Sequence, residues 1–331
     1  MSKRRFILAR RRKTRSRLEV ILAVLVVVIA SVYSLVRNET AQPAKSTAQG
    51  TGTSAGSGDT RVWFLDVGQG DSELIRLKTG QVILIDAGTR DTAQQLTDML
   101  KELGVKKIDI LIATHPHEDH IGGMASVVQN FPIGQIYMPK IPDSQVPTTA
   151  VYEKLLKAID AKNLKITAAR GQKTLIDDSG LKFELLGPNS DRYEDLNNYS
   201  VVAKLTCGEK SFLFMGDAET PSEKELLAKG LDLKSDVLKC GHHGSSTSTG
   251  AAFLKAVSPK YAIISCGVNN DYGHPHKEVL NRLNKANVTI YRTDLQDTIL
   301  AVCDGKTIDF QAKQKSVIKG SPHSYEAAAP D

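Results

Sequence analysis

The sequence predicts an α/β protein in which two β-sheets pack together and helices cover them. Short β-branched and apolar runs, such as Val82–Ile85 and Ile108–Ala113, read as buried strands. Between residues 60 and 312, groups of such runs are broken by segments of helical periodicity. Elements in this order favour a four-layer arrangement, because each sheet must bury one face on the other sheet and one under helices.

The expected elements follow from the local pattern. The predicted strands are short apolar runs and cover residues 62–65, 74–77, 82–85, 108–113, 183–186, 201–206, 211–215, 237–240, 261–265, 289–291 and 298–302. The predicted helices have apolar residues three and four positions apart and cover residues 92–103, 124–129, 152–161, 222–229 and 277–286. Each strong polar cluster of the chain comes directly after one of these strands.

The basic charge of the chain is concentrated at its N-terminus. The formal net charge is +6, but residues 1–37 contain ten Lys and Arg residues and one acid. Residues 38–331 therefore contain 33 basic and 36 acidic residues. Net charge gives no support to a DNA-binding face on the globular part.

Residues 18–36 are predicted to anchor the protein in a membrane by a single span. Val20–Val36 is an uncharged run of 17 residues, at the short end of the roughly 17–25 residues that cross a bilayer. Basic residues precede it, so residues 1–17 are expected to stay in the cytoplasm and the catalytic part outside. The alternative is a cleaved signal peptide, whose apolar region is usually about 7–15 residues, and which leaves the protein secreted. The remaining predicted parts are a flexible linker at 37–59, the globular domain at 60–312 and a disordered tail at 313–331.

The segment that organises the chemistry is residues 114–123, which follow the strand at 108–113. Three histidines and two carboxylates fall within its residues 115–120. His115 and His117 lie two apart at a strand end, so their side chains point the same way and can bind one cation. Asp119 and His120 lie just beyond and can reach a second. Imidazole and carboxylate without thiolate suit zinc, manganese or iron. The four cysteines have no CxxC spacing and are expected to be buried free thiols.

Two further polar clusters can supply the remaining ligands. Asp217 ends the strand at 211–215, and the pair His242 and His243 ends the strand at 237–240. Alone, Asp217 would read as an ordinary turn residue, because Gly-Asp is common in turns. Together with the first cluster, these residues complete a pair of metal sites.

The motifs together resemble the metallo-β-lactamase superfamily and, more narrowly, its ComEC-type branch. That branch comprises the extracytoplasmic hydrolase domain of bacterial DNA-uptake channels and its stand-alone relatives. The motifs that carry the resemblance are LDVGQGDS at 65–72, THPHEDHIGG at 114–123, NNYSVV at 197–202, FMGD at 214–217, GHHGS at 241–245 and YGHPH at 272–276. The resemblance covers roughly residues 60–312. It implies an αββα sandwich with two divalent metal ions, zinc or manganese, along one edge.

The resemblance also implies a role for each ligand. His115 and His117 would bind the first metal, Asp119 and His120 the second, and Asp217 would bridge them. One histidine of the GHHGS motif would complete the second site, with a slight preference for His242. His243 would then face the substrate as phosphate donor or general acid, which makes Asp119 and His243 the expected catalytic pair. The residues expected to support the ligands or to face the substrate are Asp66, Asp86, Asn198, Ser200, Ser245, His274 and His276. For Asp66 and Asp86, capping a turn is an equally good interpretation.

The chain departs from the superfamily pattern at one position. Many members place a third histidine for the first metal before the GD motif, but there is no histidine between His120 and His242. The first metal is therefore expected to be loosely held, to take water, or to recruit His274 or His276. This departure favours manganese or a labile zinc and argues against β-lactam hydrolysis.

These observations predict a membrane-tethered extracellular hydrolase. The leading hypothesis is a phosphodiesterase, specifically a nuclease that acts on DNA through a metal-bound hydroxide. A cell-envelope phosphodiesterase acting on phosphorylcholine or teichoic acid is the alternative. A binding module that kept the fold without catalysis is the third hypothesis.

Overall fold

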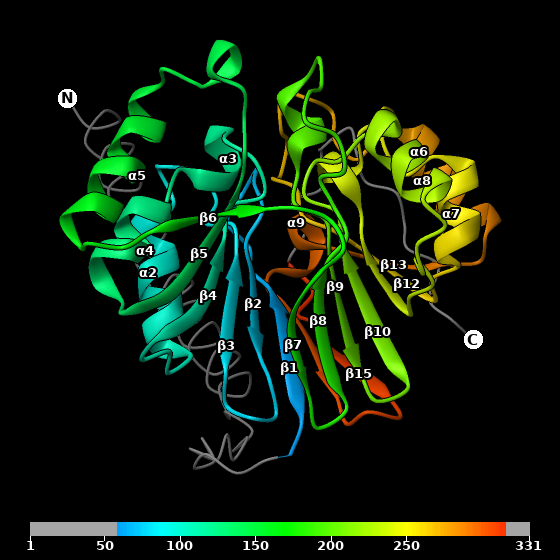
Figure 1. Cartoon of the computed structure of the whole chain (residues 1–331). Helices are drawn as coiled ribbons and strands as arrows, with labels where there is room; N and C mark the ends of the chain where they lie inside the picture. Colours follow the sequence, from blue (N-terminus) through cyan, green and yellow to red (C-terminus); the bar gives the residue numbers. More distant parts are fainter. Residues whose placement is uncertain (1–57, 316–331) are drawn as a thin grey trace, which may run out of the picture. The chain divides into compact units, whose positions relative to one another are not determined.

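The computed structural model describes residues 58–315, in which two β-sheets lie face to face with helices on both outer sides (Figure 1). The predicted four-layer arrangement of sheets and helices is confirmed. The predicted anchor at 18–36, nearly all of the linker at 37–59 and most of the tail lie outside the described residues. Within residues 58–315, no helix has both the length and the apolar character that crossing a membrane requires.

The first sheet has eight strands in the order β15-β14-β1-β2-β3-β4-β5-β6. Their bounds are β1 (Thr60–Phe64), β2 (Glu73–Arg76), β3 (Val82–Ile85), β4 (Ile108–Ile112), β5 (Ile133–Pro139), β6 (Ile166–Ala169), β14 (Ile299–Cys303) and β15 (Ile308–Gln311). The helices that follow its strands are α2 (Ala93–Glu102), α3 (Glu118–Ile121), α4 (Met124–Asn130) and α5 (Ala150–Ala161).

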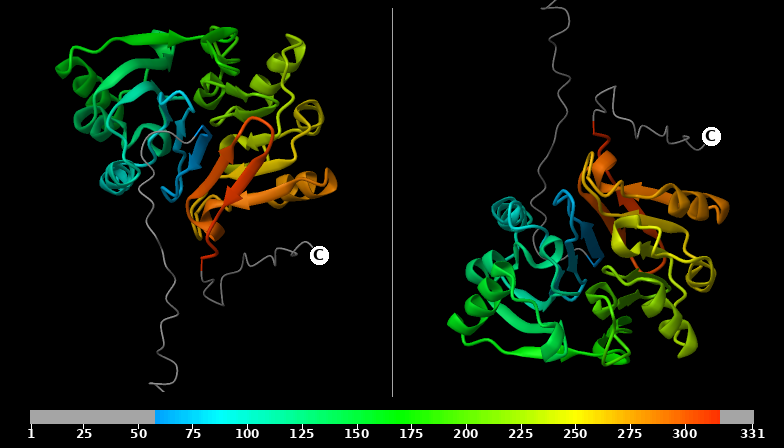
Figure 2. Two further views of the ribbon diagram at one scale, coloured as in Figure 1. Left: turned by 90° about the horizontal axis from the view of Figure 1, so that it is seen from below. Right: turned by 90° about the horizontal axis from the view of Figure 1, so that it is seen from above.

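The second sheet has seven strands in the order β13-β12-β11-β10-β9-β8-β7. Their bounds are β7 (Lys173–Asp178), β8 (Leu181–Leu185), β9 (Ala203–Cys207), β10 (Lys210–Phe214), β11 (Val237–Lys239), β12 (Tyr261–Ile264) and β13 (Thr289–Arg292). Its helices are α6 (Thr220–Ala228), α7 (Ala251–Val257), α8 (Lys277–Lys285) and α9 (Thr293–Gln296), and short 3-10 turns occur at η1 (Asp143–Gln145), η2 (Leu196–Tyr199) and η3 (Gly241–Gly244). Figure 2 shows the helices of the two halves on opposite sides of the paired sheets.

Strand residues alternate between two hydrophobic environments. In β1, Val62 and Phe64 join the apolar cluster between the sheets, whereas Trp63 packs in the cluster under the helices of the first sheet. In β10, Phe212 and Phe214 face the same inter-sheet cluster, and Leu213 lies under the helices of the second sheet. Both faces of these strands are buried, which explains why the sequence shows continuous apolar runs rather than alternation.

The elements that the sequence did not predict are mainly edge strands. β6 and β15 end the first sheet and β7 ends the second. These strands carry few fully buried residues, so they lack the apolar run that identifies an interior strand. β5 and α7 were also not predicted. The expectation for the four cysteines is confirmed, since all are buried and unpaired.

The topology brings the polar clusters to one edge of the molecule. β3 runs parallel to β4, and β10, β11 and β12 run parallel to one another. The carboxyl ends of parallel strands meet at the same sheet edge, where ligands typically bind in α/β proteins. β9 is antiparallel to β10, so the segment that precedes β9 reaches this edge too.

Candidate metal centre

The loops at this edge are locked together by backbone contacts. The Asp71 N–H donates to the Asp119 carbonyl over 3.1 Å, and the Ala87 N–H donates to the His120 carbonyl over 2.7 Å. Gly70 is required for this approach, because a Cβ at that position would lie 2.4 Å from the Asp119 carbonyl oxygen. The position of Asp119 therefore depends on a loop that is distant in sequence.

Gly70→Ala is expected to displace the loop that carries Asp119 and to weaken metal binding. The added methyl group meets backbone rather than a flexible side chain, so the two loops must separate. The expected loss of metal affinity is about 10–100-fold, as for the loss of an outer-sphere partner. Isothermal titration with Mn²⁺ measures it. Gly58→Ala is the control, because a Cβ there meets nothing within 4 Å; equal affinities in the two variants would contradict the prediction.

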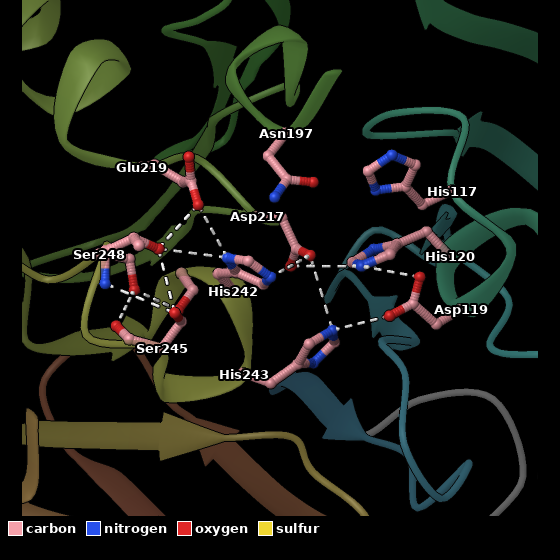
Figure 3. A network of polar contacts seen from close by, with 12 residues as sticks. His117, Asp119, His120, Asn197, Asp217, Glu219, His242, His243, Ser245 and Ser248 are labelled. Atoms are coloured by element: carbon pink, nitrogen blue, oxygen red, sulfur yellow. Dashed lines mark hydrogen bonds and ion pairs between the residues drawn. The ribbon is translucent and has the colours of Figure 1, made fainter. Parts of the chain in front are cut away.

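Four residues form the larger of two clusters of possible metal ligands among the described residues (Figure 3). Atoms of Asp119, His120, Asp217 and His243 all lie within 4.8 Å of one another. His120 Nε2 lies 3.2 Å from Asp217 Oδ1, and His243 Nε2 lies 3.2 Å from Asp119 Oδ2 and 3.6 Å from Asp217 Oδ2. Two imidazoles and two carboxylates directed at one point form a donor set that suits zinc or manganese.

Hydrogen bonds at the far side of each ring aim the two imidazoles. His120 Nδ1 donates to Asp86 Oδ2 over 2.7 Å. His243 Nδ1 lies 3.0 Å from the Ser265 carbonyl and 3.1 Å from Asp71 Oδ1. With the proton held on Nδ1, each ring presents the Nε2 lone pair to the cluster, as metal-ligating histidines do.

The cluster requires positive charge at its centre. His120 Nε2 and Asp217 Oδ1 are buried and make no hydrogen bond, so two lone pairs face each other. Burial lowers the pKa of His243, but Asp217 and Asp71 outweigh it and raise the pKa to about 10. Burial also lowers the pKa of His120, and Asp217, Asp86 and Asp119 together raise it well above its usual range. A divalent cation would supply the positive charge that these buried carboxylates favour, so the residues fit a metal ion.

His115 and His117 lie next to this cluster. His115 Nε2 is 3.1 Å from His117 Nδ1 and 3.8 Å from Asp217 Oδ2. Burial and then the neighbouring His120 lower the pKa of His115 well below its usual range, so its ring is neutral and able to ligate. The Asp217 carboxylate is therefore near His115 as well as near His120 and His243, as a carboxylate shared by two metals would have to be.

The motif alone favours His242 for the second metal, whereas the geometry groups His243 with Asp119, His120 and Asp217. The geometry therefore favours His243 for this role, and the assignment is part of the proposal below. His242 Nδ1 is 3.0 Å from Glu219 Oε1, its Nε2 is 3.8 Å from Asp217 Oδ2, and its side chain is 24% exposed. Both histidines have positive φ, 48° and 52°, a conformation that only the folded backbone specifies.

Asp86, Ser200 and Ser245 support the cluster from behind. Asp86 also accepts from the Thr114 N–H over 2.8 Å. Ser200 Oγ accepts from the Asp217 N–H over 3.0 Å and lies 3.4 Å from His115 Nδ1. Ser245 Oγ is 3.0 Å from the hydroxyl of Thr247, which in turn donates to Glu219 over 2.7 Å. These contacts fix the orientation of ligand side chains.

Two other candidates lie away from the ligand atoms. Asp66 accepts from the Gly68 N–H over 3.2 Å and forms an ion pair with Lys315, so it caps a turn rather than orienting an imidazole. Asn198 Oδ1 accepts from the N–H groups of Glu219 and Ser222, each over 3.3 Å. It therefore holds the start of α6.

The loop at residues 272–276 brings its two histidines, His274 and His276, to the neighbourhood of His242. The rings of His274 and His242 are 5.4 Å apart, and burial followed by His243 lowers the pKa of His274 to about 4. His276 Nδ1 accepts from the Ser246 N–H over 2.9 Å. His274 is thus a neutral, buried ring, whereas His276 is occupied in holding the loop.

The comparisons agree with this geometry. The chain matches the metallo-β-lactamase superfamily over residues 65–268. The chain belongs to this superfamily. It is 33% identical to ComE operon protein 3 of Bacillus subtilis, 35% to competence protein ComA of Neisseria gonorrhoeae and 31% to recombination protein 2 of Haemophilus influenzae. The matches cover 73%, 72% and 72% of this chain and 33%, 31% and 27% of the relatives. The resemblance to a ComEC-type protein is confirmed, and the chain spans about a third of the length of these relatives.

One part of this metallo-β-lactamase site was not predicted from the sequence. Lys239 Nζ donates to Asp71 Oδ2 over 2.7 Å, and each side chain is 1% exposed. Asp71 thus joins a buried lysine to the ring of His243. Glu219, behind His242, was missed as well. Asp71 belongs to the LDVGQGDS motif, so a sequence pattern could have identified it as a site residue. Lys239 lies inside a β-strand, where no local sequence pattern distinguishes it.

Lys239→Met is expected to destabilise the metallo-β-lactamase fold by about 3–5 kcal/mol, because it leaves the buried Asp71 carboxylate without its partner. Urea unfolding monitored by circular dichroism measures the effect. Lys101→Met is the matched control, since Lys101 and its partner Asp98 are 52% and 53% exposed and such surface pairs contribute little. A loss below about 1 kcal/mol for Lys239→Met would show that Asp71 does not depend on this pair.

Proposed function

We propose that this protein is a metal-dependent phosphodiesterase that cleaves DNA outside the cell membrane to which residues 18–36 tether it. The observation that carries the proposal is the position of Asp217, whose carboxylate lies near imidazoles of both proposed ligand sets. Its Oδ1 lies 3.2 Å from His120 Nε2, and its Oδ2 lies 3.8 Å from His115 Nε2 and 3.6 Å from His243 Nε2. A carboxylate shared by two ligand sets supports a two-metal site for in-line displacement at phosphorus.

Each residue has a proposed part. His115 and His117 would hold the first metal, Asp119, His120 and His243 would hold the second, and Asp217 would contribute to both. Bound divalent metals lower the pKa of a water from 15.7 to about 7 and stabilise charge on phosphoryl oxygens.

His242 faces the phosphate. Glu219 accepts from its Nδ1 over 3.0 Å, which leaves the partly exposed Nε2 side of the ring available to a phosphoryl oxygen. A fixed donor at that position supports catalysis because it stabilises charge that develops in the transition state.

DNA is the proposed substrate because the relatives include a protein named for competence and another named for recombination. The charge of the globular part does not add to this proposal. A cell-envelope phosphodiester, such as phosphorylcholine or teichoic acid, is the competing substrate and would use the same site.

A substrate panel tests the proposal. The full chain in detergent is incubated with Mn²⁺ or Zn²⁺ and with bis-p-nitrophenyl phosphate, single- and double-stranded DNA, and wall material bearing phosphorylcholine. Cleavage of the ester and of DNA is expected. DNA left intact under both metals overturns the nuclease proposal, and release of phosphorylcholine instead selects the cell-envelope substrate. If none of these substrates is hydrolysed, the remaining hypothesis is a binding module without catalysis.

Location has its own test. We propose that the globular part lies on the extracytoplasmic side. Protease added to intact cells is expected to remove it, whereas a cytoplasmic control protein is spared. A globular part that survives until the cells are lysed contradicts the proposed topology.

A further inference from the structure

Asn197 lies in η2, the short turn that precedes β9 at the metal edge. Its N–H donates to Asp195 Oδ1 over 2.8 Å, which fixes the backbone there. The residue is 6% exposed. Figure 3 shows its side chain directed into the space bounded by His117, Asp217 and Glu219.

The two ends of the Asn197 side-chain amide face different neighbours. In Figure 3 the nitrogen is turned to the side of Glu219 and Asp217, away from His117, and ionised carboxylates only accept hydrogen bonds. Asn197 Oδ1 is buried and has no hydrogen-bond partner. In Figure 3 this oxygen points towards the side on which His117 lies.

A buried acceptor without a partner is costly and is rare in folded proteins unless a ligand or ion completes it. The first metal needs such a group. Its two histidines, His115 and His117, have no third imidazole between residues 120 and 242. Among the described ring contacts, His274 neighbours His242, His243, Tyr272 and His276 rather than His115 or His117.

We propose that Asn197 Oδ1 is the remaining protein ligand of the first metal, in the role that a third histidine has in many superfamily members. The ligand set of that metal is then two imidazoles, the shared carboxylate of Asp217 and one amide oxygen. Amide oxygens are hard ligands that suit manganese better than zinc. The first site is therefore expected to favour manganese more than a site in which a third imidazole takes the place of the amide. This inference rests on the two-metal site of the proposed function.

Metal binding tests the inference without any substrate. The full chain, stripped with a chelator, is titrated with Mn²⁺ and followed by electron paramagnetic resonance, and its metal content is measured after dialysis. The wild type is expected to bind two Mn²⁺. Asn197→Ala is expected to keep one and to bind the other at least about tenfold more weakly, the lower end of the effect of losing even an outer-sphere partner.

Two further variants make the test decisive. Asn198→Ala is the control. It removes the neighbouring amide, which donates to Glu219 over 3.4 Å, and it is expected to keep both Mn²⁺ ions. Asn197→His supplies an imidazole and is expected to raise the zinc-to-manganese ratio at equal concentrations of the two metals. If Asn197→Ala does not fold, as judged by circular dichroism, Asn197→His alone decides.

Each outcome has one meaning. Asn197→Ala with two Mn²⁺ bound at wild-type affinity, or Asn197→His with an unchanged metal ratio, overturns the ligand assignment. A wild type that binds one metal overturns it too. A wild type that binds two metals, loses one in Asn197→Ala and leaves DNA intact supports the ligand assignment while the proposed function fails.

Discussion

Asp119→Ala is expected to abolish phosphodiester turnover while the fold persists. Asp119 Oδ2 lies 3.2 Å from His243 Nε2, and its side chain is 29% exposed at the open side of the cluster. In the proposed scheme the carboxylate would therefore both bind metal and border the substrate. Its loss should lower kcat by at least about 10³-fold, because it removes a ligand of the metal that activates water.

The loop that carries Asp119 should survive this replacement. Its backbone carbonyl, which accepts from the Asp71 N–H, is unchanged by the truncation. Hydrolysis of bis-p-nitrophenyl phosphate with excess Mn²⁺ measures turnover, and circular dichroism measures folding. Glu118→Ala is the matched control, since Glu118 is exposed and its carboxylate contacts only the Arg90 N–H among the described hydrogen bonds. Undiminished turnover of a folded Asp119→Ala protein would refute the two-metal scheme.

His243→Ala and His242→Ala are expected to fail in different ways. His243 is 1% exposed within the four-residue cluster, so its loss should remove one bound metal together with activity. His242 is partly exposed, so its loss should leave the metal content unchanged and lower kcat by about 10²–10³-fold, as for a lost transition-state donor. Metal content and kcat, measured on the same preparations, separate the two cases.

The reverse pattern would restore the assignment that the motif alone favours. Loss of metal in His242→Ala, with full metal content in His243→Ala, would make His242 the ligand and His243 the residue that faces the phosphate. Equal loss of metal in both would place both rings on metal ions and leave no histidine of this pair for the substrate.

Much of the fold was predictable because its strands are buried on both faces. Val82–Ile85 is a continuous apolar run and Ile108–Ala113 is interrupted only by Asp109, and such runs need no tertiary information to identify. The edge strands β6, β7 and β15 were not predictable, because they bury few residues and therefore carry little apolar pattern.

The candidate ligands were predictable for a similar reason. His115, His117, Asp119 and His120 are adjacent in the sequence, and the spacing of residues at a strand end determines which side chains can meet. Asp217 and the histidine pair were predictable as well, because polar residues that directly follow buried strands gather at the carboxyl edge of a sheet.

That imidazoles and carboxylates meet at one edge of two packed sheets can be inferred from the sequence alone. The division of roles among them depends on contacts that exist only in the folded chain. Which of His242 and His243 faces the cluster depends on two consecutive positive φ angles, and sequence patterns do not specify these. The buried pair Lys239 and Asp71 joins residues 168 positions apart. The Asn197 Oδ1 that lacks a partner is buried at the edge where loops distant in the sequence meet. These contacts depend on chain folding rather than on local spacing, which is why no motif revealed them.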